Sequence, residues 1–188
     1  MTLVEYGVPL VKKLVPPTSK TRYIAGYCAL NLDMPDTFAD WHQPDHLYCP
    51  ADQPPEELYV YGEGVGPNYD TNHIFGDYGI IESAEFFKNC GFTPVYPEVY
   101  RSNHFRAILD LLHYYIMVNS MDNALPLQIQ GATFEHLGTE VQKQELLDKA
   151  RLIRPHLPPE RRPLLDTWIA DEETYEERRA RFGRRSAI

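Results

Sequence analysis

The chain has 188 residues, of which 43% are hydrophobic, and its 27 acidic residues outnumber its 18 basic residues to give a formal net charge of -9. This size and apolar content suffice for a hydrophobic core without disulfides or a structural metal. The negative charge disfavours general binding to nucleic acid or to anionic lipid, and it suits docking on a basic partner. No run approaches the roughly 18 consecutive apolar residues of a membrane span, so we expect no association with a membrane.

The cysteines and the first residues indicate a cytoplasmic location. Cys28, Cys49 and Cys90 form no CxxC pair, and an odd number of thiols cannot all pair within one chain. Reduced cysteines are typical of cytosolic proteins. The opening residues, MTLVEYGVPLVKKLVPP, lack the basic start and the long apolar region of a secretory signal. We therefore expect a cytoplasmic protein.

The predicted sheet is small. Residues 22–32 are rich in strand formers, and Gly26 within them indicates a bulge or a close approach of another chain segment. Residues 92–100 are extended, but Pro94 and Pro97 remove two backbone donors and place this segment at a sheet edge or outside the sheet. The segments near 3–11 and 58–62 complete the expected strands.

Residues 33–57 form a long, proline-rich connection without an apolar period. A loop of this length in a compact domain is commonly a functional cover or a disordered link. We expect an ordered excursion packed over the body of the protein, because apolar side chains are spaced along it. These anchors are Phe38, Trp41, Leu47 and Tyr48.

The helices follow from capping residues and from apolar residues at helical spacing. Ser83 can cap a helix over 84–90 that Gly91 ends in a left-handed conformation, and Ser102 can cap a longer helix over 103–118. On the polar face of the longer helix we expect a surface or half-buried line of charged side chains. This line consists of Arg106, Asp110 and His113.

Two further helices are expected towards the end of the chain. Thr139 and Gln142 have the spacing of a capping box, which predicts a helix running to about Leu152. Pro155, Pro158 and Pro159 break it, and a short helix is expected over 160–170.

The candidate catalytic residues are His73, Asp77, His104 and Arg106. The first two lie in a glycine-containing loop, and the last two open the long helix. A histidine beside a carboxylate can exchange protons with a substrate, while an arginine at a helix start favours a phosphate or carboxylate. However, no phosphate-binding or GxSxG pattern is present, and turn and capping hydrogen bonds are the favoured explanation for these side chains.

The candidate metal ligands are His42 and His46, with Asp45 and Cys49 nearby. Imidazole, carboxylate and thiolate all bind zinc. Pro44 lies between the two histidines, so their spacing is not that of a helical metal motif, and hydrogen bonding within the loop is the favoured alternative. We expect no cofactor.

The candidate binding residues are mostly aromatic. Tyrosine and tryptophan are enriched among the side chains that anchor protein interfaces. Thirteen tyrosines is an unusual number for this length. The set comprises Trp41, Tyr69, Asp70, Tyr78 and Tyr100.

Together these features predict an α+β fold: a small mixed or antiparallel sheet packed by two or three helices over residues 1–154, and a helical C-terminal extension over 155–188.

The leading functional hypothesis is a cytoplasmic binding or regulatory protein that docks on another protein, for which a basic partner suits the charge. A bacterial antitoxin or immunity protein fits this composition. The alternative is a small hydrolase or transferase, with or without a metal, whose pocket lies between residues 70 and 106. Binding of nucleic acid by the arginines after residue 177 ranks third, and the oligomeric state is open.

Overall fold

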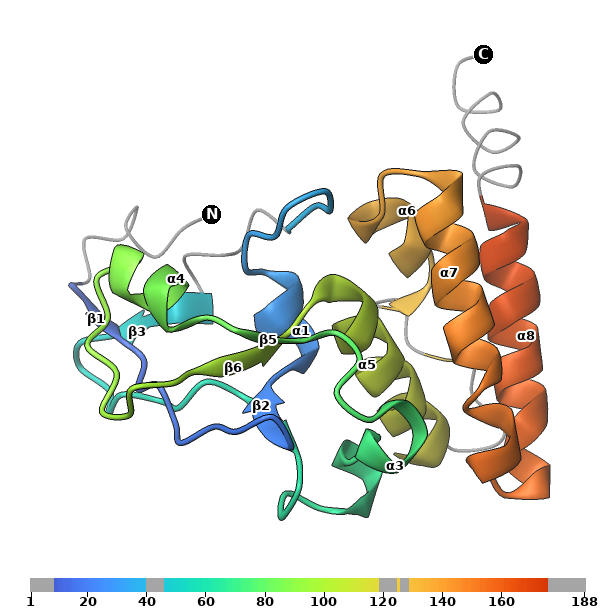
Figure 1. Ribbon diagram of the computed structural model, residues 1–188, viewed down its shortest axis with the longest axis horizontal. Helices are drawn as coiled ribbons and strands as arrows, with labels where there is room; N and C mark the ends of the chain where they lie inside the picture. Colours follow the sequence, from blue (N-terminus) through green and yellow to red (C-terminus); the bar gives the residue numbers. More distant parts are fainter. Residues whose placement is uncertain (1–8, 40–45, 119–124, 126–128, 176–188) are drawn as a thin grey trace.

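The computed structural model describes residues 9–39, 46–118, 125 and 129–175. Within them the chain forms a two-stranded sheet, a four-stranded sheet and a set of helices, which confirms the predicted α+β class. Figure 1 shows the strands gathered at one end of the molecule and helices α7 and α8 side by side at the other. Helix α5 lies between these two parts.

The four-stranded sheet is mixed and has the order β4-β2-β6-β5. Strands β2 (Arg22–Ile24) and β4 (Val60–Gly62) are antiparallel, with Tyr23 opposite Tyr61. Strand β6 (Tyr100–Ser102) runs parallel to β2 and antiparallel to β5 (Ile80–Glu82). A separate antiparallel pair joins β1 (Leu10–Lys12) to β3 (Tyr48–Pro50).

The predicted strand over 22–32 is wrong beyond Ile24. The chain turns at Gly26, which has a φ of +62°, and continues as helix α1 (Gly26–Leu30). A Cβ at position 26 would lie 3.3 Å from the Tyr61 ring, so the predicted close approach at this glycine is confirmed. Helix α1 is almost wholly buried, and a short buried helix gives the same apolar run as a buried strand.

The segment 92–100 is mostly a loop, and its strand begins only at Tyr100. Strand β6 lies between β2 and β5, at the centre of the sheet rather than at its edge. Pro94 and Pro97 precede this strand, so they remove no donor from the sheet. Strand β5 and strand β3 were not among the predicted sheet segments.

The helices at 84–90 and 103–118 are present, but other residues cap them. At α4 (Ala84–Asn89), Glu82 Oε1 accepts the Ala84 N–H at 2.8 Å, while the Ser83 hydroxyl accepts from Arg101 Nε. At α5 (His104–Val118), Asn103 Oδ1 accepts the Arg106 N–H at 2.9 Å. Gly91 has the expected left-handed conformation, with a φ of +76°.

The C-terminal helices share one hydrophobic core with α5. The Thr139–Gln142 capping box opens α7 (Glu140–Arg151), as predicted, and α8 (Arg162–Glu173) follows two short 3-10 turns at Arg154–His156 and Pro159–Arg161. Leu165 and Trp168 of α8 belong to the same buried cluster as Ile108 of α5. The domain boundary near residue 154 stays a prediction, although the described residues beyond it pack on the same core.

The described parts of the 33–57 connection are attached to the body by their backbone. Phe38 N–H donates to the His136 carbonyl at 3.0 Å, in α6 (Ala132–His136), yet the Phe38 side chain is 58% exposed. Leu47 is buried, as expected of an anchor, and Trp41 lies outside the described residues. The described helices include none that is long and apolar enough to cross a membrane.

Candidate functional site

A fully buried ion pair lies on the face of α5 that meets the sheet. Arg106 Nε and Asp110 Oδ1 are 2.9 Å apart, one helical turn from each other, and both side chains have 0% exposure. The expectation of a surface or half-buried line of charges is therefore wrong for this pair. The spacing of four residues is the same for an exposed and a buried pair, so it did not reveal the burial.

The polar atoms of this pair are held by groups from two other parts of the chain. Asp110 accepts hydrogen bonds from the hydroxyls of Thr71, at 2.5 Å, and Tyr23, at 3.1 Å. Burial raises the pKa of Asp110, and the positive charge of Arg106 opposes that rise. The remaining N–H groups of Arg106 donate to Tyr23 Oη, Asn72 Oδ1, Gly76 O and Tyr78 O. The pair thus joins β2, the 71–78 segment and α5.

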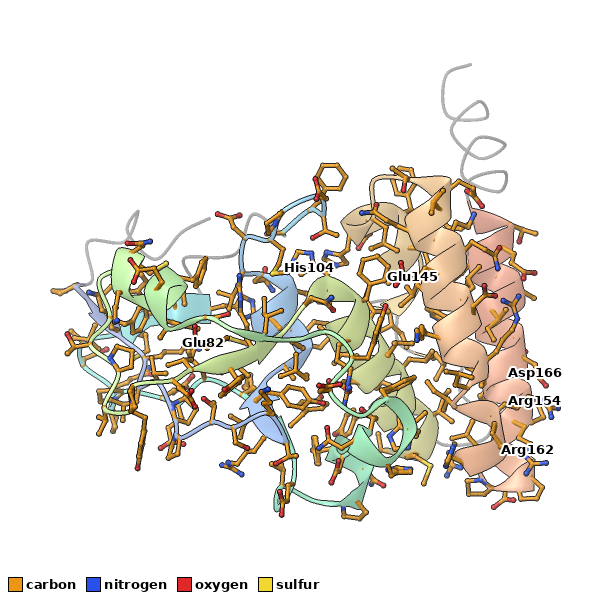
Figure 2. All side chains as sticks on the ribbon, in the orientation of Figure 1. Glu82, His104, Glu145, Arg154, Arg162 and Asp166 are labelled. Carbon is orange, nitrogen blue, oxygen red and sulfur yellow. The ribbon has the colours of Figure 1, made fainter. Side chains whose placement is uncertain are left out.

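The Arg106→Met substitution tests this role. It leaves Asp110 buried without its cation, and loss of one member of a buried pair lowers the free energy of unfolding by about 3–5 kcal/mol. Arg154→Met is the matched control, because Arg154 pairs with Asp166 at 2.9 Å but both side chains are about half exposed (51% and 49%). Figure 2 labels this pair on the C-terminal helices. The free energy of unfolding of the control should fall by only about 0–1 kcal/mol. Equal losses in denaturant unfolding of the two variants would contradict the assignment.

The four candidate catalytic residues have different surroundings. His73, in the short helix α3 (Asn72–Phe75), is exposed, and its ring centroid lies 5.1 Å from that of His156 and 6.4 Å from that of His113. Asp77 is exposed, and Arg106 donates to the carbonyls on either side of it. The guanidinium group of Arg106 is therefore bonded to partners inside the protein.

His104 has yet another set of contacts. It is fully buried at the start of α5, its Nε2 lies 2.9 Å from the Leu32 carbonyl, and its ring centroid lies 5.7 Å from that of His136. These contacts differ from those of His73 and Arg106, and a joint catalytic role for the set stays a prediction. Burial lowers the pKa of His104 to about 4.

This shift makes stability depend on pH. Below a pKa of about 6.5 the unfolded chain binds a proton at His104, whereas the folded chain does not until about pH 4, so stability falls with decreasing pH across this window. From about pH 7.5 to about pH 5 the loss should be ~2 kcal/mol. Glutamine at position 104 does not titrate in this range. In denaturant unfolding of His104→Gln at the two pH values, the loss of stability should therefore be smaller than in the unchanged protein by about that amount. An unchanged pH dependence in this variant would rule out the buried neutral imidazole.

The candidate binding residues that the structure describes have different surroundings. Asp70 Oδ1 accepts the Asn72 N–H at 2.9 Å, which is the turn role considered from the sequence. Tyr78 donates to Glu145 Oε1 at 2.8 Å, and Tyr100 is buried in the sheet. Of the described members, Tyr69 lines a pocket.

The proposed metal ligands are only partly described. His46 is half-buried next to β3, while His42 lies outside the described residues, so the His42–His46 site stays a prediction. Among the described residues, no group of three or more histidine, cysteine, aspartate and glutamate side chains is arranged to hold a metal ion.

A pocket of about 660 Å³ lies between α1, β4, the 3-10 turn η2 (Pro67–Tyr69) and the end of α5. Tyrosine dominates its lining, so we name it the tyrosine pocket. Glu57 and Tyr59 are exposed at its rim, and Tyr59 is 63% exposed. The described lining consists of Gly26, Tyr27, Glu57, Leu58, Tyr59, Val60, Tyr61, Val65, Tyr69, Leu111, Tyr114 and Tyr115.

Three of the tyrosine rings contact one another. The ring centroids of Tyr69 and Tyr114 are 4.7 Å apart with an interplanar angle of 31°, so these rings lie partly face to face. The Tyr61 ring stands nearly perpendicular to Tyr69, at 86° and 5.1 Å. Such packing fixes the rings, and Tyr69 and Tyr114 remain partly exposed whereas Tyr61 is buried.

Three tyrosines of the pocket have a raised pKa. The Tyr27 and Tyr115 hydroxyls are 3.0 Å apart, and burial raises the pKa of both Tyr27 and Tyr61. A hydrogen bond with Tyr114 raises the pKa of Tyr69. Glu57 is therefore the formally charged group in the described lining, which contains no lysine, arginine or histidine. The pocket suits an apolar, aromatic or cationic group and disfavours an anion.

Sequence reasoning identified one member of this lining, Tyr69. The alternation of Tyr59 and Tyr61 in a strand and the adjacent Tyr114 and Tyr115 near a helix end were available signals, but only the fold brings them together. Comparisons of the whole chain with protein families, with curated proteins and with solved structures found no match.

Proposed function

We propose that this chain is a binding protein that docks on a basic protein partner through the tyrosine pocket. The single observation that supports this most strongly is the lining itself, in which six tyrosines and the carboxylate of Glu57 surround a space of about 660 Å³. Tyrosine is among the side chains that contribute most to binding at interfaces, because it buries a large rigid ring and keeps a polar tip.

The charge of the whole chain supports a basic partner. A net charge of -9 attracts positively charged proteins and speeds their encounter at low salt. The described lining carries one negative and no positive formal charge, so the local and overall fields have the same sign.

Binding agrees better with this lining than catalysis does. The described lining has no histidine, cysteine, serine or lysine, and Glu57 and the tyrosine hydroxyls are its only side-chain groups that could exchange a proton. Docking in the cytoplasm on a partner whose activity is then restrained, as by an antitoxin or immunity protein, is the form of this proposal that the acidic composition favours.

A photo-crosslinking experiment tests the docking surface. Tyr59, which is 63% exposed at the pocket rim, is replaced by p-benzoylphenylalanine, and the matched control carries it at Val141, which is 79% exposed on α7. Irradiation in the native cells should attach a basic protein at position 59 but not at 141. The yield of this adduct should fall with added salt and with Glu57→Gln, because both reduce the attraction between opposite charges before irradiation.

Two results would contradict the proposal. One is equal labelling of the same proteins from positions 59 and 141, which would indicate non-specific contact. The other is a specific adduct at position 59 whose partner is acidic and whose yield is insensitive to salt.

A further inference from the structure

We infer that the tyrosine pocket receives an arginine side chain of the partner, an inference that rests on the proposed docking function and names its chemistry. The guanidinium group would lie against the tyrosine rings, with Glu57 as its counter-charge.

The ring geometry suits a flat cation. Tyr69 and Tyr114 are tilted by only 31°, and Tyr61 stands at 86° to Tyr69, so the rings form walls in different planes. The face of an aromatic ring carries negative potential, and arginine is the cation found most often over such faces. A planar guanidinium can stack on one wall while its N–H groups point to another.

The hydrogen-bonding groups also suit arginine. The Glu57 carboxylate at the rim can accept two parallel N–H bonds from a guanidinium, a geometry that an ammonium group cannot match. The paired hydroxyls of Tyr27 and Tyr115 offer further acceptor oxygens. Leu111 and Val65 supply apolar surface for the methylene stem of the side chain.

No cation from the described part of the chain occupies this position. Lys13 pairs with Glu56, the residue next to Glu57, at 3.3 Å. Arg106 is buried against Asp110. Since Glu57 has no ion pair among the described residues, its charge is available to a cation brought by a partner.

Short peptides test the inference without a known partner. The probes are acetylated peptide amides with arginine, lysine or citrulline between glycines, since citrulline has nearly the shape of arginine but no charge. Binding to the full chain is measured by ligand-observed NMR. The arginine peptide should bind about tenfold more tightly than the citrulline peptide, with lysine between them, as expected for a cation over desolvated rings.

Matched variants locate the binding. Tyr69→Leu and Glu57→Gln should each weaken binding of the arginine peptide by about tenfold. Tyr96→Leu and Glu56→Gln are the controls, because Tyr96 is 49% exposed outside the tyrosine pocket and Glu56 neighbours Glu57 without lining it. The controls should leave the affinity unchanged.

The outcomes separate this inference from the docking function. Equal binding of arginine and citrulline, or displacement of the arginine peptide by a neutral disaccharide, would overturn the inference. If the basic partner still crosslinks at position 59 in a Glu57-dependent manner, the docking function stands. If neither the peptides nor a basic protein contacts the pocket, both fail.

Discussion

The structure depends on the burial of the Arg106–Asp110 ion pair. Taking two charges out of water costs several kcal/mol for each ion, and only close geometry with additional hydrogen bonds offsets that cost. Here Tyr23, Thr71 and Asn72 supply side-chain partners, and the backbone on either side of Asp77 supplies carbonyls. Because these partners belong to different elements, the pair fixes the positions of those elements relative to α5.

The tyrosine pocket shares helix α5 with this ion pair. Helix α5 carries Asp110 in one turn and Tyr114 and Tyr115 in the next, and Tyr23, which bonds both charges, lies opposite Tyr61 in the sheet. The ion pair is therefore buried, whereas Tyr114 and Tyr115 are partly exposed, although all four residues lie along one helix. The cation that suggested an anion site from the sequence is paired with Asp110 inside the protein, so the proposed binding surface is the tyrosine pocket instead.

Local signals in the sequence predicted the helices better than the sheet. The Thr139–Gln142 box and Gly91 act within one helical turn, so neighbouring residues suffice to identify them. Each strand of the four-stranded sheet has three residues, too few for an alternating pattern, and the run after Ile24 could equally be strand or helix. Ser83 and Ser102 are good capping residues, but Glu82 and Asn103 beside them reached the free N–H groups instead.

The candidate site was the least predictable part. Tyr27, Glu57, Tyr69 and Tyr114 lie far apart along the chain, and no spacing rule connects them. Only the antiparallel pairing of β2 with β4, and the packing of α1 on α5, bring them to one pocket. The high tyrosine content indicated an aromatic surface but not its location.

The most direct measurement is a tyrosine-ring NMR titration of the isotopically labelled chain with the arginine peptide. If the tyrosine pocket is the docking surface, the ring signals of Tyr61, Tyr69 and Tyr114 shift together, because all three contact one another, while those of Tyr78 and Tyr100 stay in place. Shifts at Tyr78 or Tyr100 with none at Tyr61, Tyr69 and Tyr114 would contradict the account.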